Sequence, residues 1–95
     1  MSYNLLQGKR GIIFGALNDL SIAWKVAERA VEEGAKIALT NTPIAVRMGD
    51  VNKLSERLGA PMIPADATSV EDLETVFTES VRELGGPIDF VLHSI

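Results

Sequence analysis

Hydrophobic residues are distributed along the chain in two alternating patterns. Short, mainly apolar runs occupy positions 11–14, 36–40, 62–64 and 88–95. Between these runs, apolar residues recur every three or four positions, which is the spacing of one face of an amphipathic helix. Runs this apolar are typical of strands buried on both faces of a parallel sheet. The pattern therefore predicts four strands alternating with three helices, in the order βαβαβαβ.

Each of the three predicted helices has residues suited to its two ends. Ser21 is a suitable cap for the first helix, and Gly34 can end it. Its apolar stripe is Ala23, Val26, Ala27, Ala30 and Val31, with Trp24 expected to pack beside it. Thr42 is predicted to cap a second helix that begins at Pro43 and continues without a break to Gly59. The expected core face of this second helix is Ile44, Val51, Leu54 and Leu58.

The third predicted helix begins after one of two overlapping capping boxes. Either Thr68 or Ser69 could accept the first free backbone N–H, paired with Glu71 or Asp72 three positions later. The apolar face of this helix comprises Leu73, Val76, Phe77, Val81 and Leu84, and Gly85-Gly86-Pro87 breaks it.

This order of elements predicts an α/β fold, a Rossmann-type doubly wound parallel sheet. Right-handed crossovers favour the strand order 3-2-1-4. No linker or internal repeat divides residues 1–95, so they form one unit. The chain ends at His93-Ser94-Ile95, inside or just past a predicted buried strand. We interpret it as the N-terminal cofactor-binding part of a single Rossmann domain, truncated after strand 4.

Composition narrows the class of protein. Hydrophobic residues make up 46% and charged residues 23%, which is typical of a globular domain. The net charge is −4 and the basic residues are scattered, so neither nucleic acid nor a membrane surface is an expected partner. The first ten residues lack the apolar stretch of a signal peptide, which favours a cytoplasmic location. Cysteine is absent and no His or carboxylate cluster has metal-ligand spacing, so no metal site is predicted.

The turn after the first strand is the strongest candidate for chemistry. Gly15 lets a ligand approach the backbone, and the amides of Ser21 and Ile22 open a helix whose dipole suits a pyrophosphate. The alternative is that Gly15 is only a turn glycine and Ser21 only a helix cap. The usual G-x-G-x-x-G fingerprint is absent, and the second strand ends in Asn41 and Thr42 instead of an acidic residue.

The residues of this turn resemble a particular enzyme family. Gly15-x5-Ser21-Ile22-Ala23-Trp24 is similar to the turn of the enoyl-acyl-carrier-protein reductases, which are divergent short-chain dehydrogenases. Asp66-Ala67 after the third strand and His93-Ser94-Ile95 at the end of the fourth match two further family signatures, in the same order. The resemblance covers the whole chain and implies NAD as the cofactor.

The resemblance assigns cofactor contacts to the first two turns. Gly15, Ser21 and Ile22 would hold the pyrophosphate and the neighbouring ribose. Thr42 takes the position beside the adenosine ribose, where other members often have a different polar residue. No basic residue stands at Asn41-Thr42-Pro43 to receive a 2′-phosphate, so NADH is expected to be preferred to NADPH.

Four more cofactor contacts follow from the resemblance. Asp66 would accept a hydrogen bond from the adenine amino group, and Ala67 would offer its backbone amide to the ring. Ser94 and Ile95 would lie near the nicotinamide. The alternative for Asp66 is a cap for the turn before the third helix. Because Thr68 or Ser69 could cap that helix without it, we favour the ligand role.

The same resemblance predicts the reaction and its missing parts. The family reduces a trans-2-enoyl thioester carried by acyl carrier protein, in bacterial fatty-acid synthesis, and its members are homotetramers. Its Tyr-x6-Tyr-x6-Lys pattern lies beyond strand 4, and the chain's one tyrosine is Tyr3. No catalytic residue is therefore expected within the chain, and His93 is interpreted as structural. Another short-chain dehydrogenase and a non-catalytic dinucleotide sensor remain as alternatives.

Overall fold

The computed structural model describes residues 5–16, 21–48, 50–66 and 68–93. Its elements follow the predicted alternation with one change, a second helix between the second and third strands. In chain order they are β1 (Arg10–Phe14), α1 (Ile22–Glu32), β2 (Lys36–Asn41), α2 (Pro43–Met48), α3 (Val51–Leu58), β3 (Met62–Pro64), α4 (Val70–Leu84) and β4 (Phe90–His93).

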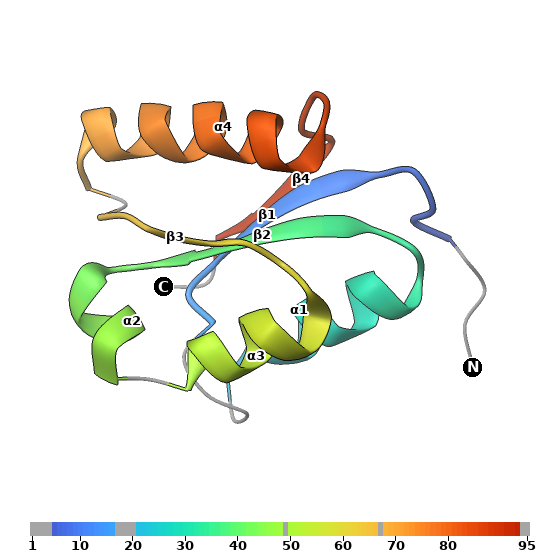
Figure 1. The fold of residues 1–95 in the computed structure, drawn as a ribbon, viewed down its shortest axis with the longest axis horizontal. Helices are drawn as coiled ribbons and strands as arrows, with labels where there is room; N and C mark the ends of the chain where they lie inside the picture. Colours follow the sequence, from blue (N-terminus) through green and yellow to red (C-terminus); the bar gives the residue numbers. More distant parts are fainter. Residues whose placement is uncertain (1–4, 17–20, 49, 67, 94–95) are drawn as a thin grey trace.

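The four strands form one parallel sheet in the order β3-β2-β1-β4, which confirms the predicted topology. In register, Phe14 of β1 lies opposite Thr40 of β2, and Asn41 lies opposite Pro64 of β3. Helix α4 covers one face of the sheet, while α1, α2 and α3 lie on the other (Figure 1). This is the layered arrangement that right-handed crossovers produce.

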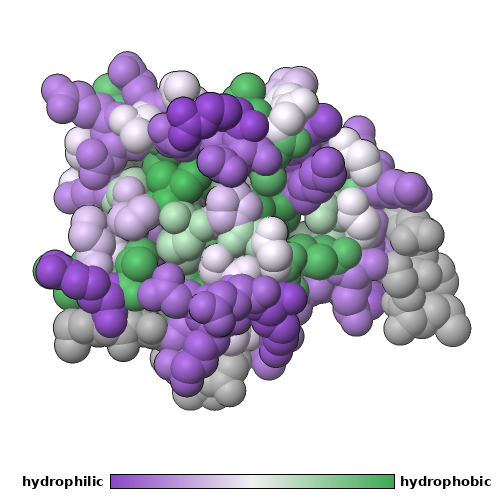
Figure 2. Space-filling model, viewed as in Figure 1, coloured by the Kyte–Doolittle hydropathy of each residue, from purple (hydrophilic) through white to green (hydrophobic). Residues whose placement is uncertain are grey.

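The core is divided by the sheet into two layers. On the α1 side, Ile13, Ile37 and Leu39 of the strands pack with buried residues of α1 and α3, including Trp24, as predicted for packing. On the α4 side, Ile12 and Phe14 pack with Val76 and Ala65. Figure 2 shows hydrophobic residues in a band between hydrophilic helical surfaces. Both faces of β1 are thus buried, which explains its unbroken apolar run.

The helix ends agree largely with the predicted signals. Gly34 follows α1 with a φ of 95°, and Gly59 ends α3 with a φ of 65°, both in the left-handed region that favours glycine. Ser69 caps α4 by accepting a hydrogen bond from the backbone N–H of Asp72 at 3.3 Å, so it is the cap rather than Thr68. Ser21 occupies the cap position of α1, but its side chain makes no capping hydrogen bond.

The prediction of one continuous helix from Pro43 to Gly59 is wrong. The Val46 carbonyl accepts a hydrogen bond from the Asn52 side chain at 2.9 Å, and Asp50 takes the cap position of a new helix. Polar side chains that compete for backbone groups interrupt helices in this way. As a result Ile44, expected in the core, is 62% exposed, whereas Val51 and Leu54 are buried.

Not every apolar position of the other helices faces the core. On α4, Val76 and Leu84 are buried, but Phe77 and Val81 are each 41% exposed. A residue next to a buried one is rotated by about 100° around the helix, so it lies at the border of the buried stripe. Val26 of α1 is at a similar border. In the described part of the chain, no helix has the length and apolar character needed to span a bilayer.

Strand β4 begins later than predicted, at Phe90 rather than Ile88. Asp89 already contacts the start of β1, because its backbone N–H donates to the Arg10 carbonyl at 2.7 Å and its carboxylate accepts from the Arg10 N–H at 2.8 Å. Ile88 packs against the α4-side core. The last two predicted strand positions, Ser94 and Ile95, lie outside the described residues.

Candidate functional site

Three turns meet at the carboxyl edge of the sheet. Because β1, β2 and β3 are parallel and in register, the residues that follow them start from one side of the molecule. Gly15 follows β1, Thr42 follows β2, and Ala65-Asp66 follows β3. Ligands of open α/β sheets bind at this edge. The topology therefore brings together three of the positions that the sequence had assigned to a cofactor.

Gly15 starts the first turn in a conformation that needs glycine. Its φ is 96°, and its N–H donates to the Thr40 carbonyl at 3.1 Å, which ties the turn to β2. Helix α1 begins a few residues later, with Ser21 in extended conformation at its cap position and Ile22 73% exposed. The first backbone N–H groups of this 11-residue helix carry partial positive charge. Residues 17–20 lie outside the described part.

Asn41 is a buried polar residue at the end of β2. Its Nδ2 donates to the Ala16 carbonyl at 3.0 Å, and its Oδ1 accepts from the Thr42 N–H at 2.8 Å. Its backbone carbonyl accepts from the Ala65 N–H at 2.8 Å. One residue therefore contacts all three turns.

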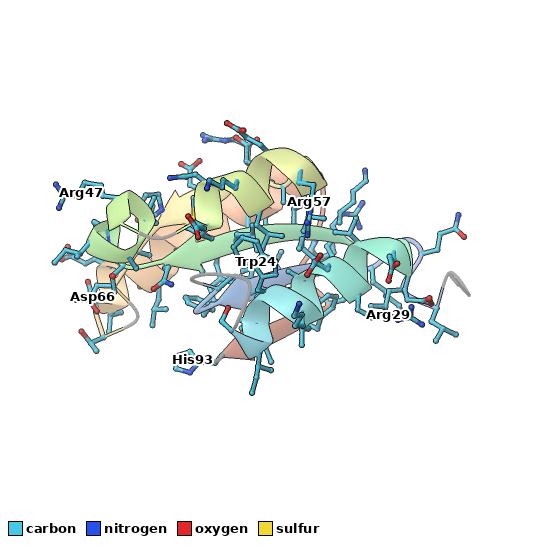
Figure 3. All side chains as sticks on the ribbon, turned by 90° about the horizontal axis from the view of Figure 1, so that it is seen from below. Trp24, Arg29, Arg47, Arg57, Asp66 and His93 are labelled. Atoms are coloured by element: carbon cyan, nitrogen blue, oxygen red, sulfur yellow. The ribbon has the colours of Figure 1, made fainter. Side chains whose placement is uncertain are left out.

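Thr42 caps α2, as predicted. Its hydroxyl oxygen accepts a hydrogen bond from the Ala45 N–H at 3.2 Å. Among the described residues the same hydroxyl donates to no acceptor, so its hydrogen is available to a ligand. Arg47, the nearest basic side chain after β2, is exposed on α2. Figure 3 shows Arg47 and Asp66 toward the same end of the molecule.

Asp66 has a structural task as well as an exposed carboxylate. Its Oδ1 accepts hydrogen bonds from both the backbone N–H and the hydroxyl of Thr68, at 2.9 and 2.7 Å. Both bonds lower the pKa of Asp66 from its ordinary value of 3.8, and the bond from the Thr68 hydroxyl has the larger effect. These bonds give Asp66 a part in the turn before α4, while Ser69 caps the helix itself, so the predicted contact of Asp66 with the adenine stays a prediction. Its other oxygen, Oδ2, accepts no hydrogen bond from any described residue.

Of the remaining residues that the sequence singled out, the structure describes His93 but not Ala67, Ser94 or Ile95. His93 ends β4 on the surface, with its ring centroid 5.6 Å from that of Phe14 and the planes inclined by 46°. Figure 3 shows it near the carboxyl edge. Ala67, Ser94 and Ile95 lie outside the described residues, so their predicted contacts stay predictions. Within the described ranges, no group of three or more His, Cys, Asp or Glu residues could hold a metal ion.

Comparison with known proteins decides the family. Residues 15–95 match the family model described as enoyl-(acyl carrier protein) reductase. The chain belongs to this family. The match includes all eight positions that the sequence had assigned to the cofactor, from Gly15 to Ile95. It also confirms the resemblance seen in the turn residues.

Curated members of the family support the assignment. The chain is 42% identical over 92 residues to an NADH enoyl-[acyl-carrier-protein] reductase of Rhizobium meliloti, covering 96% of this chain and 33% of that protein. It is 38% identical over 96 residues to the FabI enzyme of Rickettsia bellii, covering 36% of that protein. The chain thus spans about a third of the length of these relatives.

Solved family members have the same fold in this region. The FabI–NADH complex of Alistipes finegoldii is 61% identical, with a TM-score of 0.95, over 98% of this chain and 33% of that chain. The Bacillus cereus enzyme, crystallised with NADP+ and an indole naphthyridinone, is 32% identical with a TM-score of 0.77, over 92% of this chain and 34% of that chain. These likenesses confirm the Rossmann-type arrangement of the family.

Sequence reasoning missed two features of the candidate site. It noted Asn41 only as the residue that replaces an acid at the end of β2, not as the link between turns. The available signal was an amide at the end of a strand that was predicted to be buried, because buried amides need hydrogen-bond partners. It also missed Asp72, whose carboxylate accepts from the Asp66 N–H at 2.8 Å. In the sequence, Asp72 was noted only as the partner of Ser69 in a capping box.

Proposed function

We propose that the chain is the cofactor-binding N-terminal part of an NADH-dependent enoyl-acyl-carrier-protein reductase of bacterial fatty-acid synthesis. The observation that carries this proposal is the convergence of the Gly15, Thr42 and Asp66 turns at one edge of a parallel sheet, in a chain of this family. The similarity to a FabI–NADH complex supports the choice of cofactor.

The described groups fit the parts of a dinucleotide. The Gly15 backbone and the amides at the start of α1 suit the pyrophosphate, with Ser21 and Ile22 at the helix start. The Thr42 hydroxyl is available as a donor for the adenosine ribose. The ionised Asp66 carboxylate keeps one oxygen for the adenine amino group, since Thr68 occupies only the other.

The rest of the proposed site is assigned through the family. Ala67 would offer its amide to the adenine ring, and Ser94 and Ile95 would lie beside the nicotinamide. These positions fall within the matched residues, and β4 directs the chain toward the same edge as β1. Parallel pairing of β4 with β1 supports a nicotinamide position beyond His93.

These contacts give the chain and the cofactor different roles in the proposed reaction. NADH, when bound, supplies the hydride that reduces the β-carbon of a trans-2-enoyl thioester on acyl carrier protein. The residues of this chain bind and orient the dinucleotide, and none of them is proposed as catalytic. The tyrosine and lysine of the family pattern would come from sequence beyond these 95 residues. A cytoplasmic homotetramer is proposed for the whole protein.

A pair of glycine substitutions tests the cofactor site. Gly15 and Gly59 both have positive φ, 96° and 65°, so alanine at either position introduces backbone strain of about 1 kcal/mol or more. Gly59 precedes β3, at the opposite edge of the sheet, and an added Cβ there would meet open space. In the longest natural polypeptide that contains this sequence, Gly15→Ala should weaken NADH binding at least tenfold, measured by calorimetry. Gly59→Ala should leave NADH binding unchanged.

Two outcomes would contradict the proposal. One is equal NADH affinity in the two glycine variants, and the other is the absence of NADH binding by the unmodified protein. Activity is tested separately, by following NADH oxidation with a crotonyl thioester. The longest polypeptide should turn over, and the 95-residue chain alone should not. NADH binding without enoyl reduction by the longest polypeptide would favour a dinucleotide sensor.

A further inference from the structure

Asn41 is the last of the five buried residues of strand β2, and it is the one that carries a side-chain amide. It is 9% exposed, and its side-chain amide uses both ends, one as donor and one as acceptor. A buried amide that lost these partners would carry a desolvation cost. The position is thus specified by hydrogen bonding rather than by packing.

The partners of Asn41 lie near the start of three separate turns. Ala16 comes directly after Gly15, Thr42 opens α2, and Ala65 comes directly before Asp66. The link to Ala16 joins residues 25 positions apart in sequence. In the parallel register that places Asn41 opposite Pro64, the Asn41 carbonyl accepts from the residue after Pro64, so the Ala65 N–H makes the last described backbone hydrogen bond between β2 and β3.

We propose that Asn41 is a positioning residue that holds the three cofactor-binding turns at fixed separations. It touches none of the cofactor itself: its side chain acts through the Ala16 carbonyl and the Thr42 amide, and its backbone carbonyl holds the Ala65 amide. This inference rests on the proposed function, because it takes the three turns as the dinucleotide site. Binding groups that are held in place before the ligand arrives lose less entropy on binding. Removing Asn41 should therefore weaken binding of the dinucleotide without altering the chemical step.

The test compares two Asn41 variants in the longest natural polypeptide. Asn41→Leu removes both side-chain hydrogen bonds, and Asn41→Asp keeps the acceptor for the Thr42 amide but places an oxygen against the Ala16 carbonyl. Both variants should raise the dissociation constant and the KM for NADH at least tenfold, equivalent to about 1.4 kcal/mol. The kcat at saturating NADH should stay within about threefold, because binding energy alone was removed.

Two controls separate positioning from loss of stability. Thr40→Val changes the neighbouring buried residue, whose hydroxyl has no partner among the described residues, and should leave NADH affinity unchanged. Val76→Ala removes buried volume on the α4 side of the sheet and should lower the melting temperature without weakening NADH binding.

The outcomes distinguish this inference from the proposed function. If the unmodified protein binds NADH and both Asn41 variants bind it within twofold, the positioning role is refuted while the proposed function stands. A loss of affinity equal to that of an equally destabilised Val76→Ala would also refute it. If Asn41→Leu does not fold, Asn41→Asp alone decides between these results. No NADH binding by the unmodified protein would overturn the proposed function instead.

Discussion

Gly11 leaves room for the ring of Phe90 beside strand β1, and a larger residue at this position should therefore destabilise the fold. The two residues are direct neighbours in register between β1 and β4. A Cβ added at Gly11 would come within 2.2 Å of two ring carbons, Cε2 and Cζ. Gly11 is not among the glycines with positive φ, so its backbone would accept alanine. The predicted effect of Gly11→Ala therefore comes from this single contact.

The loss of folding free energy can be estimated from the displacement of the Phe90 ring. Ordinary carbon contacts begin near 3.4 Å, so the Phe90 ring has to retreat by more than about 1 Å. Phe90 is half-buried against the α1-side core, and turning outward would forfeit part of a burial worth about 1.5–3 kcal/mol. The alanine also restricts the unfolded chain, which returns about 0.4–1 kcal/mol. The expected net loss of folding free energy is roughly 1–2 kcal/mol.

A double-mutant cycle assigns this loss to the contact. Denaturant unfolding of the longest natural polypeptide would compare Gly11→Ala alone with the same change in a Phe90→Ala background. Without the ring, Gly11→Ala should be neutral or slightly stabilising, so the coupling energy should be about 1.5–3 kcal/mol. An equal effect in both backgrounds would refute the reasoning. A change below about 0.5 kcal/mol in the unmodified background would do the same.

Three further predictions concern the cofactor edge and the α4 interface. Hydrogen bonds from Thr68 keep the pKa of Asp66 below 3.8, so the carboxylate stays charged from about pH 5 to 8. Its contribution to folding stability is present above pH 3.8 and is lost as the pH falls through the lowered pKa. Calorimetry should therefore show a constant preference for NADH over its deaminated hypoxanthine analogue across that range, and Asp66→Asn should remove it. The complete enzyme should prefer NADH to NADPH, since Arg47 is the one basic residue in positions 42–48; a tenfold preference for NADPH would contradict this and implicate Arg47. Ser80→Ala should raise unfolding stability by about 1 kcal/mol, because the Ser80 hydroxyl is buried with no partner among the described residues, and a loss of stability would show that the hydroxyl is bonded.

The sequence by itself determined the architecture and part of the candidate site. Four apolar runs separated by amphipathic stretches were sufficient to predict the strand order 3-2-1-4, because crossovers have one hand and buried parallel strands need apolar faces. Gly15 was found as a turn residue and Ser69 as one of two candidate caps, because the chemistry of turns and caps depends on a few adjacent positions. The family match likewise confirmed a resemblance read from short motifs.

Only the tertiary structure decided how those pieces are joined. The Asn52 side chain ends α2 by reaching a carbonyl six positions back, which helical periodicity does not encode. Asp66 both builds its turn and exposes an oxygen, a combination that depends on where Thr68 lies. Asn41 reaches Ala16, 25 positions earlier, because folding places the ends of β1 and β2 side by side. Such contacts arise from the packing of distant segments, and local sequence patterns contain no information on their distances.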